Sequence, residues 1–222
     1  RTRFILIGIR KDLTKKNKLP SSQFFELLYR KKTSFIRDKG LPQNPTLRSA
    51  IGDLLGSNGR IPTPDRHHFF SGLYSKPKSS YQSVMRIGSK YYTPDSHSFA
   101  NHTDEIQRRF KYILRYQKDC KRLNETIRKK FKISKHTIIP LSGSEKAPTI
   151  TTLPDDYIHY CEPRILTVRE YARIQTFPDW YEFKGKYTTG GRLRTQEVPR
   201  YTQIGNAVPP LFGEQSGAVL KR

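Results

Sequence analysis

The sequence predicts an α/β protein, from an apolar run near its start and two helix signatures near its end. Residues Phe4 to Ile9 are apolar except for Gly8. An apolar run of this length is typical of a strand buried on both faces of an α/β sheet. The two helix signatures occupy residues 163–179 and 201–210.

The first helix signature is a capping box followed by a stop. Thr167 precedes Glu170 by three residues, so the two side chains can satisfy each other's backbone amide groups at the helix start. Pro178 ends the helix because it lacks an amide hydrogen and clashes with the preceding turn. The second signature is a tight turn at residues 205–206 that leads into a helix, and the proline at 209 or 210 fits the first turn of that helix.

Three further helices are predicted between these ends. The first spans residues 21–32, and the second spans 46–55, with Thr46 as its cap and Gly56 as its end. The third is a long helix over 103–131 with an apolar stripe on one side and a basic face on the other. That basic face can contact phosphates or simply be solvated, and the sequence leaves both open. We expect residues 57–92 to be irregular, since they are rich in Gly, Pro, Ser and basic residues.

The composition points to a polyanionic partner. The chain of 222 residues carries a formal net charge of +23, with 34% hydrophobic and 12% aromatic residues. A charge this large repels itself unless a polyanion neutralises it, and the aromatic content argues against a purely disordered basic tail. Charge alone does not separate a DNA-binding protein from a ribosomal-type, RNA-binding or membrane-surface protein.

Candidate nucleic-acid contacts lie in the irregular middle of the chain. Basic residues alternate there with tyrosines, and we predict phosphate contacts from Lys76, Lys78, Arg86 and Lys90. Taken singly, each of these residues is more typical of a solvated surface loop.

Neither cysteine has a sequence context that predicts a nucleophile or a metal ligand. Cys120 and Cys161 lie far apart, and no cysteine–histidine spacing matches a zinc site, so we expect no metal. Glu162 follows Cys161, and a neighbouring carboxylate raises the pKa of a thiol and weakens it as a nucleophile. This cysteine usage suits a reducing cytoplasm, and no apolar run is long enough to predict a membrane span.

Several segments resemble motifs of the DNA cytosine-5 methyltransferases. Residues 163–179 and 201–210 are similar to the ninth and tenth motifs of that family. The first residues are similar to its eighth motif, in which an arginine, any residue and a second arginine precede an apolar strand. The middle of the chain matches in patches, among them residues 46–55, 102–110 and 147–156.

The resemblance implies roles for particular residues. In the family the second arginine of the eighth motif contacts the carbonyl oxygen of the target cytosine, which implies that role for Arg3, with Arg1 beside it. A planar, permanently charged guanidinium suits the electron density that moves onto this oxygen. The tenth motif completes the pocket for S-adenosyl-L-methionine, which implies cofactor contacts from Asn206, Ala207 and Val208. Asn206 also fits a turn, where asparagine tolerates a left-handed backbone.

The resemblance also implies a division of the chain. Residues 1–15 would form an edge strand of a Rossmann-like catalytic domain. Residues 16–199 would form the small, irregular target recognition domain with the ninth-motif helix, and 200–222 a helix that returns to the catalytic domain. Within the recognition domain, Thr152 and Leu153 match a segment that implies contact with double-stranded DNA. The family extrudes its target cytosine from the duplex, because the ring edge is unreachable in a stacked helix.

Two motifs of the family have no match in the sequence, namely the proline–cysteine nucleophile and the glycine-rich cofactor loop. We therefore expect the chain to be inactive alone and to need a separate N-terminal catalytic half. The sole methionine, Met85, also suggests a piece of a longer protein, either a natural subunit or a fragment. The resemblance further implies a restriction–modification system, with a cognate restriction endonuclease as functional partner. The alternative is a non-catalytic DNA-binding relic or regulator.

Overall fold

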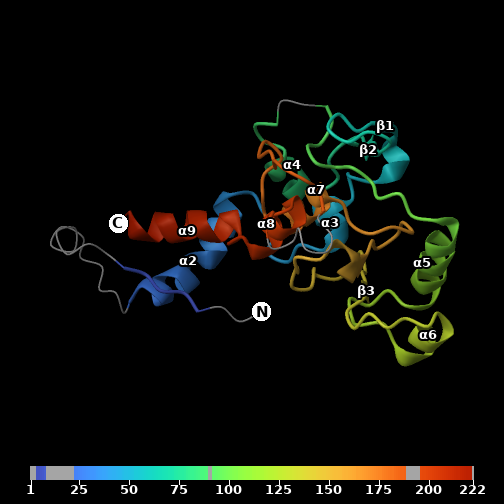
Figure 1. Ribbon diagram of the computed structural model, residues 1–222. Helices are drawn as coiled ribbons and strands as arrows, with labels where there is room; N and C mark the ends of the chain where they lie inside the picture. The colour runs from blue at the N-terminus through green and yellow to red at the C-terminus, as the bar shows by residue number, and fades with distance from the viewer. Residues whose placement is uncertain (1–3, 9–22, 90–91, 189–195, 222) are drawn as a thin grey trace.

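The computed structural model describes residues 4–8, 23–89, 92–188 and 196–221. Its helices and strands are short, and they alternate with long irregular connections (Figure 1). In chain order they are α2 (Phe24–Asp38), α3 (Leu47–Ile51), the 3-10 helix η2 (Gly56–Asn58), β1 (Arg60–Pro62), β2 (Phe70–Gly72), α4 (Ser80–Met85), α5 (Asp104–Tyr116), α6 (Glu125–Lys130), β3 (Ile139–Pro140), the 3-10 helix η3 (Pro154–Asp156), β4 (Tyr157–Ile158), α7 (Val168–Ile174), α8 (Arg200–Asn206) and α9 (Pro210–Leu220).

The main body of the molecule is organised around α7. This helix begins with the predicted capping box, in which the Thr167 side chain accepts from the amide of Glu170 and the Glu170 side chain accepts from the amide of Thr167. Helices α3 and α8 both pack against α7, and α4 packs against α3. The largest apolar cluster of the chain surrounds α7 and includes its residues Val168, Tyr171 and Ala172. Helix α7 is therefore buried on every side, not only on one apolar face.

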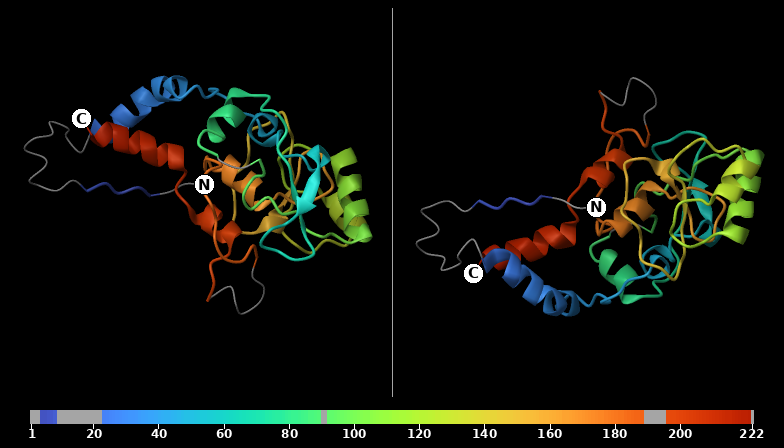
Figure 2. Two further views of the ribbon diagram at one scale, coloured as in Figure 1. Left: turned by 90° about the horizontal axis from the view of Figure 1, so that it is seen from above. Right: turned by 90° about the horizontal axis from the view of Figure 1, so that it is seen from below.

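Helices α2 and α9 form a separate pair that projects from the main body (Figure 2). Phe24 and Leu28 of α2 and Val219 of α9 make a small apolar cluster of their own. The side-chain amide of Gln215 also donates from Nε2 to the backbone carbonyl of Leu28 at 2.7 Å. The chain thus leaves the main body at both of its ends, and the two departing segments pack together.

The strands form two small sheets. Strands β1 and β2 pair antiparallel, with Ile61 opposite Ser71, and β3 and β4 pair in parallel over two residues each. Among the described residues, no helix is long and apolar enough to cross a membrane.

The predicted strand near the start of the chain is not formed over residues 4–8, the described part of the apolar run. Phe4 and Leu6 are 89% and 83% exposed, and only Ile7 packs against the cluster of α2 and α9. A strand needs a neighbour to accept and donate its ladder hydrogen bonds, and no described segment takes that place. Residues 4–8 therefore do not form a buried strand within the described part of this chain, and their pairing with a separate catalytic half stays a prediction.

The predicted long helix over 103–131 is wrong, because two helices replace it. Gln117 adopts an extended backbone at the end of α5. Its side chain donates to the carbonyl of Arg122 at 3.0 Å and accepts from the amide of Asn124 at 3.0 Å. Asn124 then caps α6 by accepting from the amide of Ile127. The predicted apolar stripe survives, because residues of both helices pack into one cluster.

Four other predicted segments also differ from the structure. Helix α2 begins at Phe24 and continues to Asp38, and α3 has the predicted Thr46 cap but ends at Ile51. Residues 57–92 are less irregular than expected, since they contain β1, β2 and α4. The predicted turn at residues 205–206 is instead the last part of α8. The glycine at 205 serves close packing, because a Cβ there would lie 2.5 Å from the carbonyl oxygen of Thr151.

Candidate functional site

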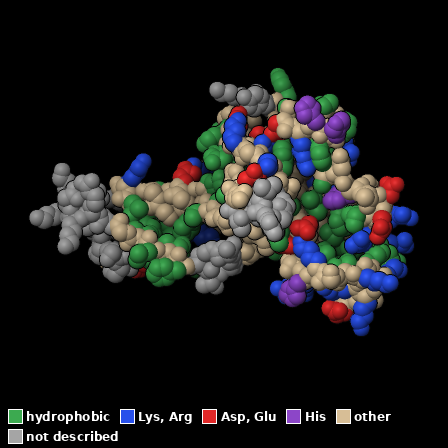
Figure 3. Space-filling model, viewed as in Figure 1, with side chains coloured by type: hydrophobic (Ala, Val, Ile, Leu, Met, Phe, Trp, Pro, Cys, Tyr) green, Lys and Arg blue, Asp and Glu red, His purple; other side chains and the backbone are tan. Residues whose placement is uncertain are grey.

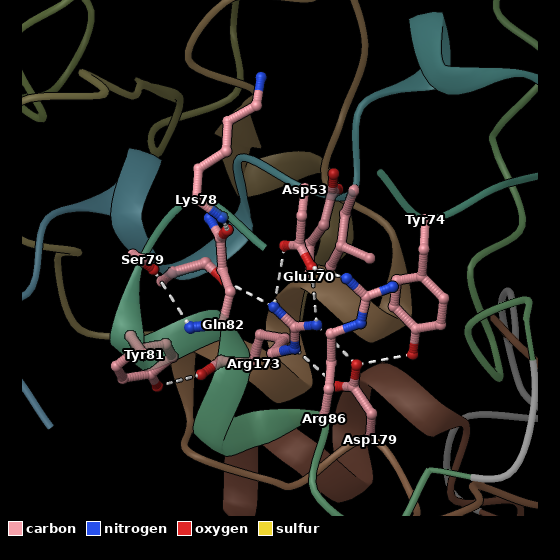
Figure 4. Close-up of polar contacts among 12 residues, drawn as sticks. Asp53, Tyr74, Lys78, Ser79, Tyr81, Gln82, Arg86, Glu170, Arg173 and Asp179 are labelled. Atoms are coloured by element: carbon pink, nitrogen blue, oxygen red, sulfur yellow. Dashed lines mark hydrogen bonds and ion pairs between the residues drawn. The ribbon is translucent and has the colours of Figure 1, made fainter. Parts of the chain in front are cut away.

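A buried ionic network fixes α7 in the main body (Figure 4). The guanidinium of Arg173 donates to both oxygens of Asp179 at 2.6 Å and to the two oxygens of Asp53 at 3.0 and 3.2 Å. It also donates to the carbonyl of Ala50 at 2.9 Å, and all three charged side chains are fully buried. Burial favours the neutral acid, but the hydrogen bonds from Arg173 hold the pKa of Asp179 below its ordinary value. The network joins α3 and the segment after it to the C-terminal end of α7 and the segment that follows α7.

A second buried group of charges lies at the start of α7. Arg164 donates to both carboxylate oxygens of Glu170, at 2.8 and 2.7 Å, and its Nε donates to Glu162 at 2.8 Å. His159 lies beside them, and its Nδ1 accepts from the amides of Cys161 and Glu162. Nε2 is therefore the protonated nitrogen of a neutral ring, and it lies 3.5 Å from Glu170. Burial, with the Arg164 charge as a second cause, lowers the pKa of His159 to about 3.

The residues predicted to contact the cofactor lie at the junction of α8 and α9. Asn206 is exposed at the end of α8, and Val208 is 65% exposed. Ala207 lines a cavity of about 330 Å³ together with Gly205, Gln175 and residues 147–150. Gln175 donates to the carbonyl of Ala207 at 3.3 Å and so ties this junction to α7. An exposed carboxamide beside an open cavity fits one wall of a site for a polar, nucleoside-sized molecule.

The predicted DNA-contacting pair lies directly beside α8. Thr152 packs against Gly205, where an added Cβ would lie 2.9 Å from the Cα of Thr152. The carbonyl of Leu153 accepts from the hydroxyl of Tyr171 at 2.8 Å. The structure therefore brings the pair at 152–153 close to the junction of α8 and α9. These two predicted sites come together although the sequence places them about 50 residues apart.

Two of the lysines predicted to contact phosphate are exposed, whereas the arginine predicted to do so is partly buried and pairs with other residues of the chain. Lys76 and Lys78 are exposed, and Lys78 lines a cavity of about 420 Å³ that also contains Arg48. Arg86 lies 3.4 Å from Asp53, donates to the carbonyl of Ser75 at 2.7 Å and stacks on Tyr74. The guanidinium of Arg86 therefore already has protein partners, and its predicted DNA contact stays a prediction.

Three residues with predicted contacts to DNA or to the target cytosine are not among those that the structure describes. Arg1, Arg3 and Lys90 lie outside the described residues. The cysteines are described, and neither has an activated thiol. Burial and then the Glu162 charge raise the pKa of Cys161, in the direction expected from the sequence. Burial also raises the pKa of Cys120. Among the described residues, no group of three or more His, Cys, Asp or Glu could hold a metal ion.

Sequence reasoning missed the buried arginines of α7. Arg169 and Arg173 are four residues apart, so they share a helix face, which is a local signal. Their acidic partners Asp95 and Asp53 are far away in the chain, and no spacing rule connects them. Without those partners, two arginines on a short helix look like a solvated face.

The fold is similar to part of a solved methyltransferase structure. A solved structure from E. coli, of a protein assigned as a DNA modification methyltransferase encoded within a prophage, superposes with a TM-score of 0.52 at 19% identity. The match covers 83% of this chain and 49% of that one. The mixed helices and small sheets described above correspond to part of that α/β enzyme.

The chain belongs to the family of C-5 cytosine-specific DNA methylases, whose family model matches residues 1–222. It is 32% identical to the type II methyltransferase M.DdeI of Desulfomicrobium norvegicum over 148 residues, which are 62% of this chain and 34% of that protein. It is 29% identical to M.BsuRI of Bacillus subtilis over 214 residues, which are 96% of this chain and 36% of that protein. It is 42% identical to M.AquIB of Picosynechococcus sp. over 76 residues, 33% of this chain and 55% of that protein. The chain thus spans about a third of the length of two of these relatives.

Proposed function

We propose that this chain is the C-terminal, DNA-recognising part of a DNA (cytosine-5)-methyltransferase. It acts with an N-terminal catalytic half that supplies the nucleophilic cysteine and the glycine-rich cofactor loop. The cofactor, S-adenosyl-L-methionine, supplies the methyl group. This chain supplies contacts to double-stranded DNA and one wall of the cofactor pocket.

The observation that carries the proposal is a group of large, exposed apolar side chains in the first 29 residues of the chain. Phe4 and Leu6 are almost fully exposed, and Phe25 and Tyr29 of the adjacent helix α2 are exposed as well. Large apolar side chains that gather in this way mark an interaction surface. An extended apolar segment needs a sheet edge to pair with, and the N-terminal half would provide that edge.

In this arrangement the α2–α9 pair belongs with the catalytic half. The division made from the sequence placed residues 16–38 with the recognition domain, whereas α2 packs against α9. The boundary proposed here therefore falls near Leu41, where the chain enters the main body. At the other end it falls near Val208, between α8 and α9.

The roles proposed for single residues follow from this division. Asn206 and Val208 are exposed because they face the cofactor and the partner half. Thr152 and Leu153, held against α8, lie next to that face and approach the DNA. For Arg3 we retain the role implied by the family motif, a contact to the carbonyl oxygen of the extruded cytosine.

The experiment mixes the chain with an N-terminal half that carries the proline–cysteine and glycine-rich motifs. Transfer of radiolabelled methyl groups to duplex DNA is measured for each half and for the mixture. We expect methyl transfer only when the two halves are mixed. The substitution Asn206→Ala should raise the KM of the mixture for S-adenosyl-L-methionine. Methyl transfer by the 222-residue chain alone would refute the division of labour. DNA binding that survives while every mixture stays inactive would favour a non-catalytic DNA-binding relic.

A further inference from the structure

The segment from Asp104 to His136 carries an unusual excess of positive charge. It contains twelve Lys and Arg residues and four Asp and Glu residues. It includes α5, α6 and the segment between them, and lies at the end of the main body farthest from the α2–α9 pair (Figure 1). We call its exposed face the α5–α6 basic surface. The sequence left open whether this face contacts phosphates, and none of the residues predicted individually to contact DNA lies on it.

The orientation of this surface is fixed by packing on its other side. Ile113 and Leu114 of α5, with Leu123 and Ile127, form an apolar cluster with Ile158 of β4. Because these side chains are buried, the polar faces of both helices must point outward. Lys and Arg side chains gather over this part of the molecule in Figure 3.

Most of these cations have no acidic partner among the described residues. Arg109, Arg128 and Lys135 form ion pairs, with Glu105, Glu125 and the pair at 155–156 respectively. The other nine are exposed, and no ion pair joins any of them to an acid within the described parts of the chain. A solvated helix face would normally interleave both signs of charge, which this one does not.

The cations on α5 form a row. Arg108, Lys111 and Arg115 are three and four residues apart, so they lie on one helix face, opposite Ile113 and Leu114. At a rise of about 1.5 Å per residue the row spans about 10 Å. Lys118, Lys121 and Arg122 continue the positive charge beyond the end of α5, and Lys129 and Lys130 add to it from α6. A row of this kind suits the regularly spaced phosphates of a nucleic-acid backbone.

We propose that the α5–α6 basic surface binds the phosphate backbone of duplex DNA without reading its sequence. This inference rests on the proposed function, because it takes duplex DNA as the partner. The surface adds a second contact region, away from the residues at 152–153 and the junction of α8 and α9. Its role is to hold and orient the duplex, since phosphate contacts position a protein and base contacts provide specificity.

The test is a triple variant, Arg108→Gln, Lys111→Gln and Arg115→Gln, in the 222-residue chain. Its binding to a labelled DNA duplex is measured by fluorescence anisotropy as a function of salt. Each lost phosphate contact reduces the slope of log K against log salt by about 0.9, so three lost contacts reduce it by about 2.7. The ratio of the DNA affinity of the unaltered chain to that of the variant should then be about 40-fold greater at 50 mM than at 200 mM salt. The loss should be similar for unrelated duplex sequences.

The control removes the same charge elsewhere, with Arg30→Gln, Lys32→Gln and Arg37→Gln on α2. Both triple variants lie on exposed helix faces, and circular dichroism should confirm that both fold. We expect the control to keep the salt slope of the unaltered chain. Equal loss in the two triple variants would overturn the proposal, because net charge would then explain it.

Three other results would overturn the proposal in distinguishable ways. An unchanged slope in the α5 variant, with affinity lost on Lys76→Gln and Lys78→Gln, would remove this surface and leave the proposed DNA partner intact. Loss of binding only to duplex RNA would assign the surface to a different nucleic acid. If the unaltered chain bound no duplex at any salt, the proposed function itself would fail, and the surface would lose its ligand with it.

Discussion

Replacing Arg173 with methionine should destabilise the fold more than any surface change. The substitution keeps an apolar stem of similar length but removes five hydrogen bonds from a fully buried guanidinium. Two buried carboxylates, Asp53 and Asp179, would then lose their main counter-charge. Asp53 would keep Arg86 at 3.4 Å, and Asp179 would keep the hydroxyl of Tyr74 at 2.6 Å.

Removing one partner of a buried ion pair costs about 3–5 kcal/mol. For a chain of this size each kcal/mol lowers Tm by about 2–4 °C, so we expect Arg173→Met to lower Tm by roughly 6–20 °C. Thermal and urea unfolding, followed by circular dichroism, measure the change. Arg37→Met is the matched control, because Arg37 forms an exposed ion pair with Asp38, and its effect should stay within about 0.5 kcal/mol.

A double-mutant cycle isolates the interaction from the cost of the substitution itself. Asp53→Asn should lower the free energy of unfolding of the unaltered chain by several kcal/mol. In the Arg173→Met background the same substitution should lower it much less. We expect a coupling free energy of about 1–3 kcal/mol between the two positions. Strictly additive effects would refute the reasoning, because they would mean that Arg173 and Asp53 do not stabilise each other.

Three further predictions concern protonation, close packing and capping. His159 has its pKa lowered from 6.5 to about 3 by burial, so its contribution to stability is complete above pH 6.5 and is lost as pH falls toward 3. The fall in the free energy of unfolding across that range, measured by urea titration, should be shallower in His159→Gln, and an identical profile would contradict this. Gly205→Ala should lower the free energy of unfolding by about 1–3 kcal/mol, because its Cβ would meet the carbonyl of Thr151. Gly217→Ala is the control, since a Cβ there has open space, and it should be neutral or stabilising by up to about 1 kcal/mol in the same assay. In Thr167→Ala, loss of the helix cap alone should lower the free energy of unfolding by about 1 kcal/mol. The total loss should be larger, because the buried ring of His97 also loses its hydrogen-bond partner at 2.7 Å. A change below about 0.5 kcal/mol would contradict the assignment.

The sequence predicted those parts of the fold that depend on neighbouring residues. The Thr167 capping box, the Thr46 cap and the proline at the start of α9 involve side chains and amides a few residues apart, and all three are present. Family membership was also evident, because long motif matches combine many such local requirements. The raised pKa of Cys161 comes first from burial and then from the Glu162 charge, and only the second cause could be predicted from the sequence.

The failures occurred where distant residues decide the outcome. The apolar run at residues 4–8 has the composition of a strand, yet a strand forms only beside another strand. The break after α5 depends on Gln117, whose side chain replaces helix hydrogen bonds with contacts to residues 122 and 124. The ion pair of Arg86 could not be predicted either, because its partner Asp53 lies 33 residues earlier in the chain.

The buried arginines limit how recognition specificity could be exchanged between relatives. Arg169 is held by Asp95, Arg173 by Asp53, and Arg200 by Asp65. A graft that replaced everything between α3 and α7 would remove all three acids and leave the buried arginines without these partners. A graft limited to α5, α6 and the segment between them would leave these three ion pairs in place.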